Sequence, residues 1–199
     1  LSHWINLTRK STLAAPRSLF DGKQLGQWEV IKKNDFEKHG KVAIKNGAIV
    51  LPVGQPATGI RWKGPFPRNH YEVSLEARRT KGNDFFCGLT FPFNDSYSSL
   101  IIGGWGGGVV GLSNIDNMAA VENETTSYLD VKENRWYQVR LRVTPKRIQA
   151  WIDQEEIFDM ETEGHKFSIW WEQEPVRPFG IASWYTTAEV RNIRIVPAP

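Results

Sequence analysis

The chain has 199 residues, of which 40% are hydrophobic, 24% are charged and 12% are aromatic, with a formal net charge of +3. This length fits one domain, and the nine Trp and ten Phe residues exclude a disordered chain because they supply a large apolar surface to bury. A charge of +3 without a run of Lys and Arg long enough to form a basic patch argues against a nucleic-acid partner. No apolar stretch approaches the roughly 18 residues of a membrane span, and the single cysteine, Cys87, excludes an internal disulfide and a Cys-based zinc site.

The predicted elements begin after an N-terminal extension, residues 1–18. It has neither an initiator Met nor the apolar core of a signal peptide, so we expect a processed protein or an excised domain. Residues 19–196 are expected to form a single β-sandwich domain. Early in it, Asn46-Gly47 separates KVAIK from AIVLP and predicts a tight β-hairpin.

Period-2 alternation dominates the rest of the chain. In YEVSLEARR, residues 71–79, and in WYQVRLRV, residues 136–143, apolar and polar side chains alternate, which is typical of half-buried antiparallel strands. We expect the basic residues at 78–81 to end the first of these strands. The residues expected to face the core are Tyr71, Val73, Leu75, Val139, Leu141 and Val143.

Further alternating segments cover residues 85–93, 147–153, 179–185 and 190–196, whereas residues 54–69 and 114–130 are predicted to be long loops. The sequence therefore predicts an all-β fold, a two-sheet antiparallel sandwich. Trp28, Trp136 and Trp151 are expected in its core. Cys87 lies mid-strand among phenylalanines, where a buried, unreactive thiol is expected.

A glycine tract surrounds Trp105. Gly106 to Gly111 match the dinucleotide pattern G-x-G-x-x-G, but the residues that follow do not form a helical pattern, so this motif does not predict nucleotide binding. Glycines instead allow a close approach of backbone or ligand. We expect them to present Trp105 at the rim of the main groove.

Carboxylates concentrate in predicted loops and at strand ends, where sites on rigid scaffolds usually lie. They are Asp84, Asp95, Asp116, Glu122, Glu124, Glu172 and Glu174. Loop carboxylates also suit Ca²⁺, although no EF-hand pattern occurs. The four histidines lack metal-ligand spacing, and no G-x-S-x-G nucleophile elbow is present.

The aromatic residues near the C-terminus point to a sugar ligand. Two adjacent indoles on a strand face opposite ways, so one of Trp170 and Trp171 is expected to be exposed or to line a groove, beside Glu172. Trp184 and Tyr185 repeat the arrangement. Exposed aromatic rings beside polar groups suit sugars, whose C–H faces stack on them. The alternative is that every tryptophan belongs to the core.

Five segments resemble the 3-keto-disaccharide hydrolase domain family, which is similar to concanavalin A-like lectin and glucanase jelly rolls. They are LFDGKQLGQW (19–28), NGAIVLP (46–52), YEVSLEARRTKGNDFFCGLTF (71–91), RWYQVRLRVTPKRIQAWID (135–153) and FGIASWYTTAEVRNIRI (179–195). The resemblance implies a substrate oxidised at C3 of the sugar and a periplasmic or extracellular location. The ketone acidifies the C2 proton, a base removes it, and the C1 aglycone leaves by β-elimination before rehydration. This chemistry needs a base and a cation or metal that polarises the ketone.

The middle of the chain departs from the family's pattern, so the candidate site is chosen from local chemistry. We expect one groove in which Glu76 or Asp84 is the base and Arg78 or a bound cation the electrophile. The residues expected to bind the carbohydrate are Asp95, Trp105, Glu122, Glu124, Glu172, Trp184 and Tyr185. The leading functional hypothesis is a hydrolase or lyase of (3-keto-)glycosides. A non-catalytic, lectin-like carbohydrate-binding module is the alternative, and a structural or interaction domain the third.

Overall fold

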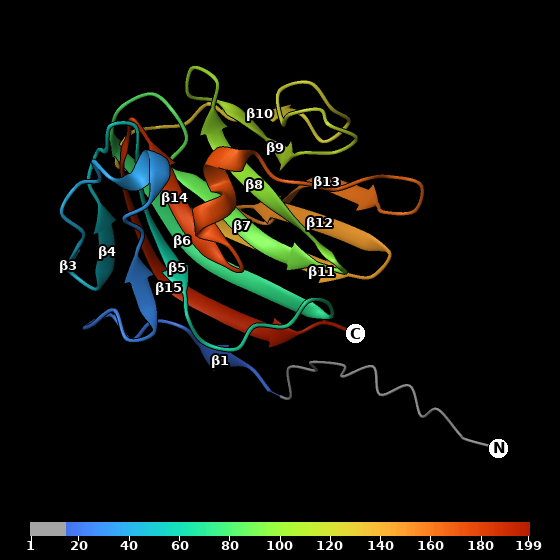
Figure 1. Ribbon diagram of the computed structural model, residues 1–199, viewed down its shortest axis with the longest axis horizontal. Helices are drawn as coiled ribbons and strands as arrows, with labels where there is room; N and C mark the ends of the chain where they lie inside the picture. The colour runs from blue at the N-terminus through green and yellow to red at the C-terminus, as the bar shows by residue number, and fades with distance from the viewer. Residues whose placement is uncertain (1–14) are drawn as a thin grey trace.

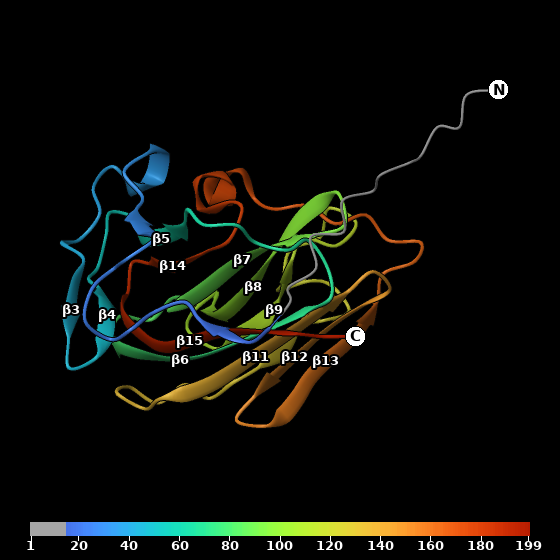
Figure 2. The same ribbon diagram turned by 90° about the horizontal axis from the view of Figure 1, so that it is seen from below.

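The computed structural model describes residues 15–199, which form two antiparallel β-sheets packed face to face (Figures 1 and 2). In chain order the strands are β1 (Arg17–Ser18), β2 (Trp28–Val30), β3 (Ala43–Lys45), β4 (Ala48–Leu51), β5 (Ala57–Trp62), β6 (Tyr71–Lys81), β7 (Cys87–Phe93), β8 (Ser96–Gly104), β9 (Val109–Ser113), β10 (Ser127–Tyr128), β11 (Tyr137–Thr144), β12 (Arg147–Ile152), β13 (Glu155–Glu161), β14 (Gly180–Trp184) and β15 (Thr187–Pro197). Two short 3₁₀ helices are η1 (Asn34–Phe36) and η2 (Trp171–Val176). The predicted all-β sandwich is confirmed.

The two sheets have different strand orders. Sheet A runs β13-β12-β11-β6-β15-β4-β3, with β1 paired to β15 at its side, and sheet B runs β10-β9-β8-β7-β14-β5-β2. β6 belongs to sheet A and the next strand, β7, to sheet B, so the chain crosses between the sheets at residues 82–86. β1 lies within the predicted extension, of which residues 1–14 fall outside the described part.

The core lies between the inner faces of the two sheets. All six residues predicted to face it are buried in one hydrophobic cluster, and β6 and β11 pair in a register that sets Leu75 beside Val139 and Val73 beside Leu141. Alternation predicted these faces correctly because a strand with one solvated side turns every second residue inward. Cys87 is buried as expected, and burial raises the pKa of its thiol to about 12.

The turn predictions are also confirmed. Asn46 and Gly47 both have positive φ, 51° and 76°, between β3 and β4, as a type I′ hairpin turn requires. The glycine tract joins β8 to β9, which pair antiparallel. It is therefore a hairpin turn and not a strand-to-helix phosphate loop.

One predicted loop is wrong, since residues 54–69 contain β5, which pairs with β2 and β14. β5 is covered on both faces: η1 lies over its outer side, where a Cβ on Gly59 would come within 2.7 Å of the Phe36 ring. A strand buried on both faces shows no alternation, so the pattern that found the other strands missed it. The second predicted loop, residues 114–130, contains the two-residue strand β10.

The tryptophans divide differently from the prediction. Trp28 is core, with 3% of its surface exposed, but Trp136 and Trp151 are half-buried under arginines of sheet A. The guanidinium of Arg191 lies 3.9 Å from the Trp136 ring centroid, and that of Arg140 lies 3.9 Å from the Trp151 ring centroid. Cation–π stacking thus covers these indoles outside the core.

The segment after β13 also differs from the prediction. Residues 171–176 form η2 and not a strand, so the indoles of Trp170 and Trp171 are both exposed, at 43% and 60%. No helix within residues 15–199 has the length and apolar character needed to cross a membrane.

Candidate functional site

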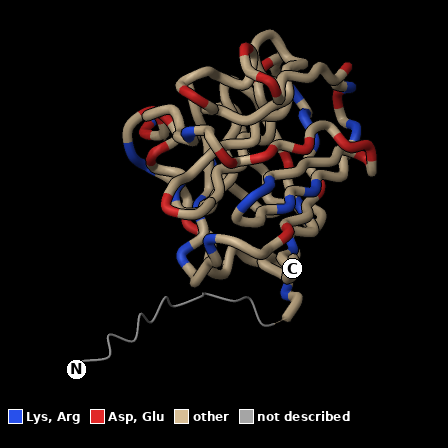
Figure 3. Tube along the Cα trace, turned by 90° about the vertical axis from the view of Figure 1, so that its right-hand side faces the viewer, with Lys and Arg blue, Asp and Glu red and all other residues tan. Residues whose placement is uncertain are grey.

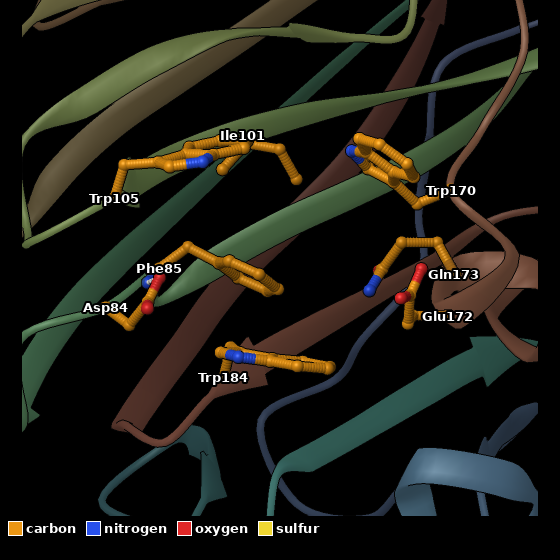
Figure 4. Close-up of a pocket in the computed structure, with 8 residues that line it drawn as sticks. All are labelled: Asp84, Phe85, Ile101, Trp105, Trp170, Glu172, Gln173 and Trp184. Carbon is orange, nitrogen blue, oxygen red and sulfur yellow. Dashed lines mark hydrogen bonds between the residues drawn. The ribbon is translucent and has the colours of Figure 1, made fainter. Parts of the chain in front are cut away.

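A pocket of about 280 Å³ opens on the outer face of sheet B (Figure 4). Ile101 of β8 forms part of the pocket floor. Its neighbours Leu100 and Ile102 face the core, so strand alternation turns Ile101 outward. The lining residues come from the β6–β7 connection, β8, the β8–β9 turn, the end of β14 and the start of η2. They are Asp84, Phe85, Ile101, Trp105, Trp170, Glu172, Gln173 and Trp184.

Aromatic side chains form most of the pocket surface. The rings of Phe85 and Trp184 stack with centroids 6.0 Å apart and an interplanar angle of 25°. Trp105 and Trp170 lie across the pocket from Trp184 (Figure 4) and keep 45% and 43% of their surfaces exposed. Rings held in this way offer flat faces to a ligand with C–H groups.

The β8–β9 turn presents Trp105 through a backbone that requires glycine. Trp105 itself has φ of 47°, and Gly106 and Gly107 have φ of 90° and 115°. A Cβ on Gly107 would also come within 3.1 Å of the Asn83 carbonyl oxygen and 3.2 Å of Arg79 Nη1. The Arg79 guanidinium, on β6, donates to the Gly107 carbonyl at 3.0 Å and to the Asp84 carbonyl at 3.4 Å, so it holds this turn against the β6–β7 connection.

Asp84 supplies a partly buried carboxyl group at one end of the pocket. Its Oδ1 accepts the Phe85 N–H at 2.8 Å, and its own N–H donates to Thr186 Oγ1 at 3.1 Å. Burial raises the pKa of the Asp84 carboxyl, against the lowering effects of the Phe85 N–H and the Arg79 charge. A raised pKa makes this carboxylate a stronger base than an exposed aspartate.

Glu172 and Gln173 lie beside one another at the other end, across the pocket from Asp84 (Figure 4). Gln173 is only 4% exposed. Its Oε1 and the Oε2 of Glu172 are buried without a hydrogen-bond partner in the described structure. The described lining residues include two carboxyl groups and no Lys, Arg or His.

Four of the ten predicted site residues, Asp84, Trp105, Glu172 and Trp184, line this pocket. Tyr185 is exposed beside it, with its ring perpendicular to that of Trp184 at a centroid separation of 6.0 Å. The structure thus brings together residues separated by up to 100 positions in the sequence, 84 to 184.

Glu76 and Arg78 do not reach the pocket, contrary to the single groove expected from the sequence. Both are on β6, where they alternate with the core residues Leu75 and Ala77 and therefore lie on the outer face of sheet A. Basic and acidic positions are interspersed along the described chain (Figure 3). Glu76 pairs with Arg191 at 3.2 Å, and Arg78 pairs with Glu189. Asp84 lies beyond the end of β6, after the chain has turned toward sheet B, and therefore faces a different surface.

The other three predicted carboxylates lie outside the pocket lining. Asp95 is in the β7–β8 turn, at the opposite end of β7 from Asp84. Glu122 and Glu124 are in the β9–β10 loop, where Glu124 lies 3.6 Å from Nε2 of His165. The Nδ1 of His165 lies 2.7 Å from Asp116, so His165, Asp116 and Glu124 form a cluster at the surface, away from the pocket.

The sequence missed Phe85, Ile101 and Gln173 as site residues and predicted the wrong secondary structure around Trp170. Pro175, two residues after Gln173, was the available signal, because proline rarely occurs inside a central strand. Residues 15–199 contain no group of three or more His, Cys, Asp and Glu side chains placed to hold a metal ion.

The fold and pocket together define a concanavalin-like sandwich with a small aromatic pocket on one outer face. Residues 15–196 match the 3-keto-alpha-glucoside-1,2-lyase-like domain. The chain therefore belongs to this family, and the resemblance seen in the sequence is confirmed. No curated protein sequence matches the chain.

Solved structures with similar folds share little sequence with the chain. The Crh5 transglycosylase in complex with NAG is 14% identical, with a TM-score of 0.64 over 96% of this chain and 87% of that one. Domain 4 of AbnA, an extracellular arabinanase from Geobacillus stearothermophilus, is 15% identical, with a TM-score of 0.58 over 92% and 91%. Carbohydrate-binding module CBM66 from Bacillus subtilis is 14% identical, with a TM-score of 0.53 over 84% and 94%. At these identities the likeness shows the fold alone.

Proposed function

We propose that this chain is a carbohydrate-active domain that cleaves 3-keto-glycosides in the pocket on sheet B. The observation that carries the proposal is the combination of aromatic faces with a carboxyl group whose pKa is raised, that of Asp84. Sugar rings stack their C–H faces on indoles and direct their hydroxyls to polar groups. A volume of about 280 Å³ lies at the small end of ligand pockets and suits one ring. Family membership and the carbohydrate-binding proteins of similar fold support the same ligand class.

Asp84 is the proposed base. The C3 ketone acidifies the C2 proton, which passes to the Asp84 carboxylate while the C2–H electron pair forms an enolate. The enolate then re-forms the C3 carbonyl, and a C1–C2 double bond forms as the C1–O bond breaks. The aglycone leaves as an oxyanion, which takes up a proton from solvent. We favour Asp84 over Glu76 because Asp84 lines the pocket, whereas Glu76 is paired with Arg191 on the other sheet.

A non-catalytic carbohydrate-binding module is the second candidate function. The elimination needs a cation that polarises the ketone, and the described lining residues include none. This lack of a cation favours a binding module over an enzyme. The same aromatic faces would then bind a sugar without turning it over.

The release of 4-nitrophenol from 4-nitrophenyl 3-keto-α-glucoside separates these functions. Asp84→Asn keeps the shape of the side chain and removes its charge, so turnover should fall by about 10²-fold or more while binding is largely kept. Asp95→Asn and Glu76→Gln are matched controls that should retain wild-type turnover. Unchanged turnover in Asp84→Asn would refute the assignment of the base. Binding of glycosides without turnover by the wild type would favour the binding module.

A further inference from the structure

The Glu172–Gln173 end of the pocket contains two unpaired polar atoms, which the elimination at Asp84 does not use. Leaving a buried acceptor without a partner costs about 1–3 kcal/mol, and such groups in native structures call for an explanation. Here two of them occur in consecutive residues at one end of a pocket. Gln173 is also too buried, at 4% exposure, to be an ordinary solvated glutamine.

The two side chains offer complementary hydrogen-bonding groups to the pocket. Figure 4 shows the amide nitrogen of Gln173 directed into the cavity, beside the Glu172 carboxyl group. An ionised carboxylate only accepts hydrogen bonds, and an amide nitrogen only donates them. A pair of neighbouring hydroxyls matches this arrangement. One hydroxyl can donate to the unpaired Oε2 of Glu172, and the other can accept from the Gln173 amide nitrogen or donate to its unpaired Oε1.

The charge of the pocket restricts the ligand further. Two carboxyl groups, Asp84 and Glu172, face it, and no cationic side chain is among its described lining residues. A ligand with its own carboxylate or phosphate would meet repulsion at both ends, in a site where burial limits the screening by water. Sugar hydroxyls meet no such repulsion.

We propose that Glu172 and Gln173 are specificity-determining residues, which bind two neighbouring hydroxyls of an uncharged sugar ring and make the pocket reject uronic acids. This proposal rests on the proposed function and adds the orientation of the ring. On a 3-keto-hexopyranoside with C2 at Asp84, the C4 and C6 hydroxyls are the hydroxyls that remain across the ring. They are therefore the pair that reaches η2.

Isothermal titration calorimetry with methyl α-glucopyranoside, its 4-deoxy and 6-deoxy analogues and the corresponding methyl glucuronide tests this proposal. The wild type should bind the glucoside at least tenfold more tightly than the glucuronide or either deoxy analogue. Glu172→Gln keeps the shape and removes the charge, so the glucoside-to-glucuronide ratio should fall toward one. Gln173→Met should weaken glucoside binding by about tenfold, the equivalent of roughly 1.4 kcal/mol.

Glu174→Gln is the matched control, because Glu174 lies on the same 3₁₀ helix, pairs with Arg177 at 2.8 Å and is outside the pocket lining. Its ligand ratios should equal those of the wild type. Equal binding of glucoside and glucuronide by the wild type, or variants at 172 and 173 that behave like Glu174→Gln, would overturn the proposal and leave the proposed function standing. Absence of binding to all the glycosides would overturn this proposal, and the release of 4-nitrophenol from the 3-keto-glucoside would then decide the proposed function separately. If circular dichroism shows that Gln173→Met does not fold, the glucoside-to-glucuronide ratio in Glu172→Gln decides the proposal alone.

Discussion

Trp105 provides the sharpest test of the pocket, since its truncation should weaken ligand binding without unfolding the protein. The indole is 45% exposed. If a Trp side chain presents at most about 250 Å², roughly 110 Å² of this one is accessible. A sugar ring that covers half of that area removes about 55 Å² from water, which is worth about 1.4 kcal/mol at 25 cal/mol per Å². Trp105→Ala should therefore raise the Kd about tenfold.

The effect on stability should be much smaller. An exposed side chain that makes few core contacts usually contributes within about 0.5 kcal/mol, and Ala at a φ of 47° bears the same backbone strain as Trp. Trp28→Ala is the opposite control, because Trp28 is 3% exposed in the core and its truncation should cost about 3–5 kcal/mol.

Both quantities can be measured on the same proteins, by calorimetric titration with the methyl glycoside that binds best and by urea unfolding followed by circular dichroism. A loss of several kcal/mol of unfolding free energy in Trp105→Ala would mean that the indole is structural. A Kd equal to that of the wild type would mean that the ligand does not stack on it. Either result would refute the reasoning.

Two further predictions use matched variants. Trp170→Ala should weaken glycoside binding about as much as Trp105→Ala. Trp171→Ala should bind like the wild type, because the Trp171 indole is more exposed and lies outside the pocket lining. Equal calorimetric effects of Trp170→Ala and Trp171→Ala would contradict this placement. The hydrogen bond with Asp116 raises the pKa of His165. Protonated His165 should therefore contribute fully to the free energy of unfolding below about pH 6.5, the pKa in the unfolded chain, and this contribution should decline as pH rises through the folded pKa. Urea unfolding across pH 5–9 should show this decline in the wild type but not in His165→Gln. His39→Gln is the control and should keep the decline, because Nδ1 of the native His39 contacts only a backbone carbonyl. A decline of the same size in His165→Gln would show that another group causes it.

The sequence determined the class of fold because the relevant signals are local. Alternation along β6 and β11 identified the residues that face the core, and Asn46-Gly47 identified a hairpin turn. Each depends on a few consecutive residues whose backbone geometry is set by their own side chains. The family was also recognisable, because its segments follow one another in order along the chain.

The tertiary structure alone decided which polar residues share a surface. Glu76 and Asp84 are eight positions apart, yet the crossing from sheet A to sheet B places them on different faces of the sandwich. Trp105, Trp170 and Trp184 meet at one pocket because β8, β7 and β14 are adjacent in sheet B and η2 lies beside them. Strand order and the docking of a short helix depend on packing between distant segments, and no local pattern of residues encodes that packing.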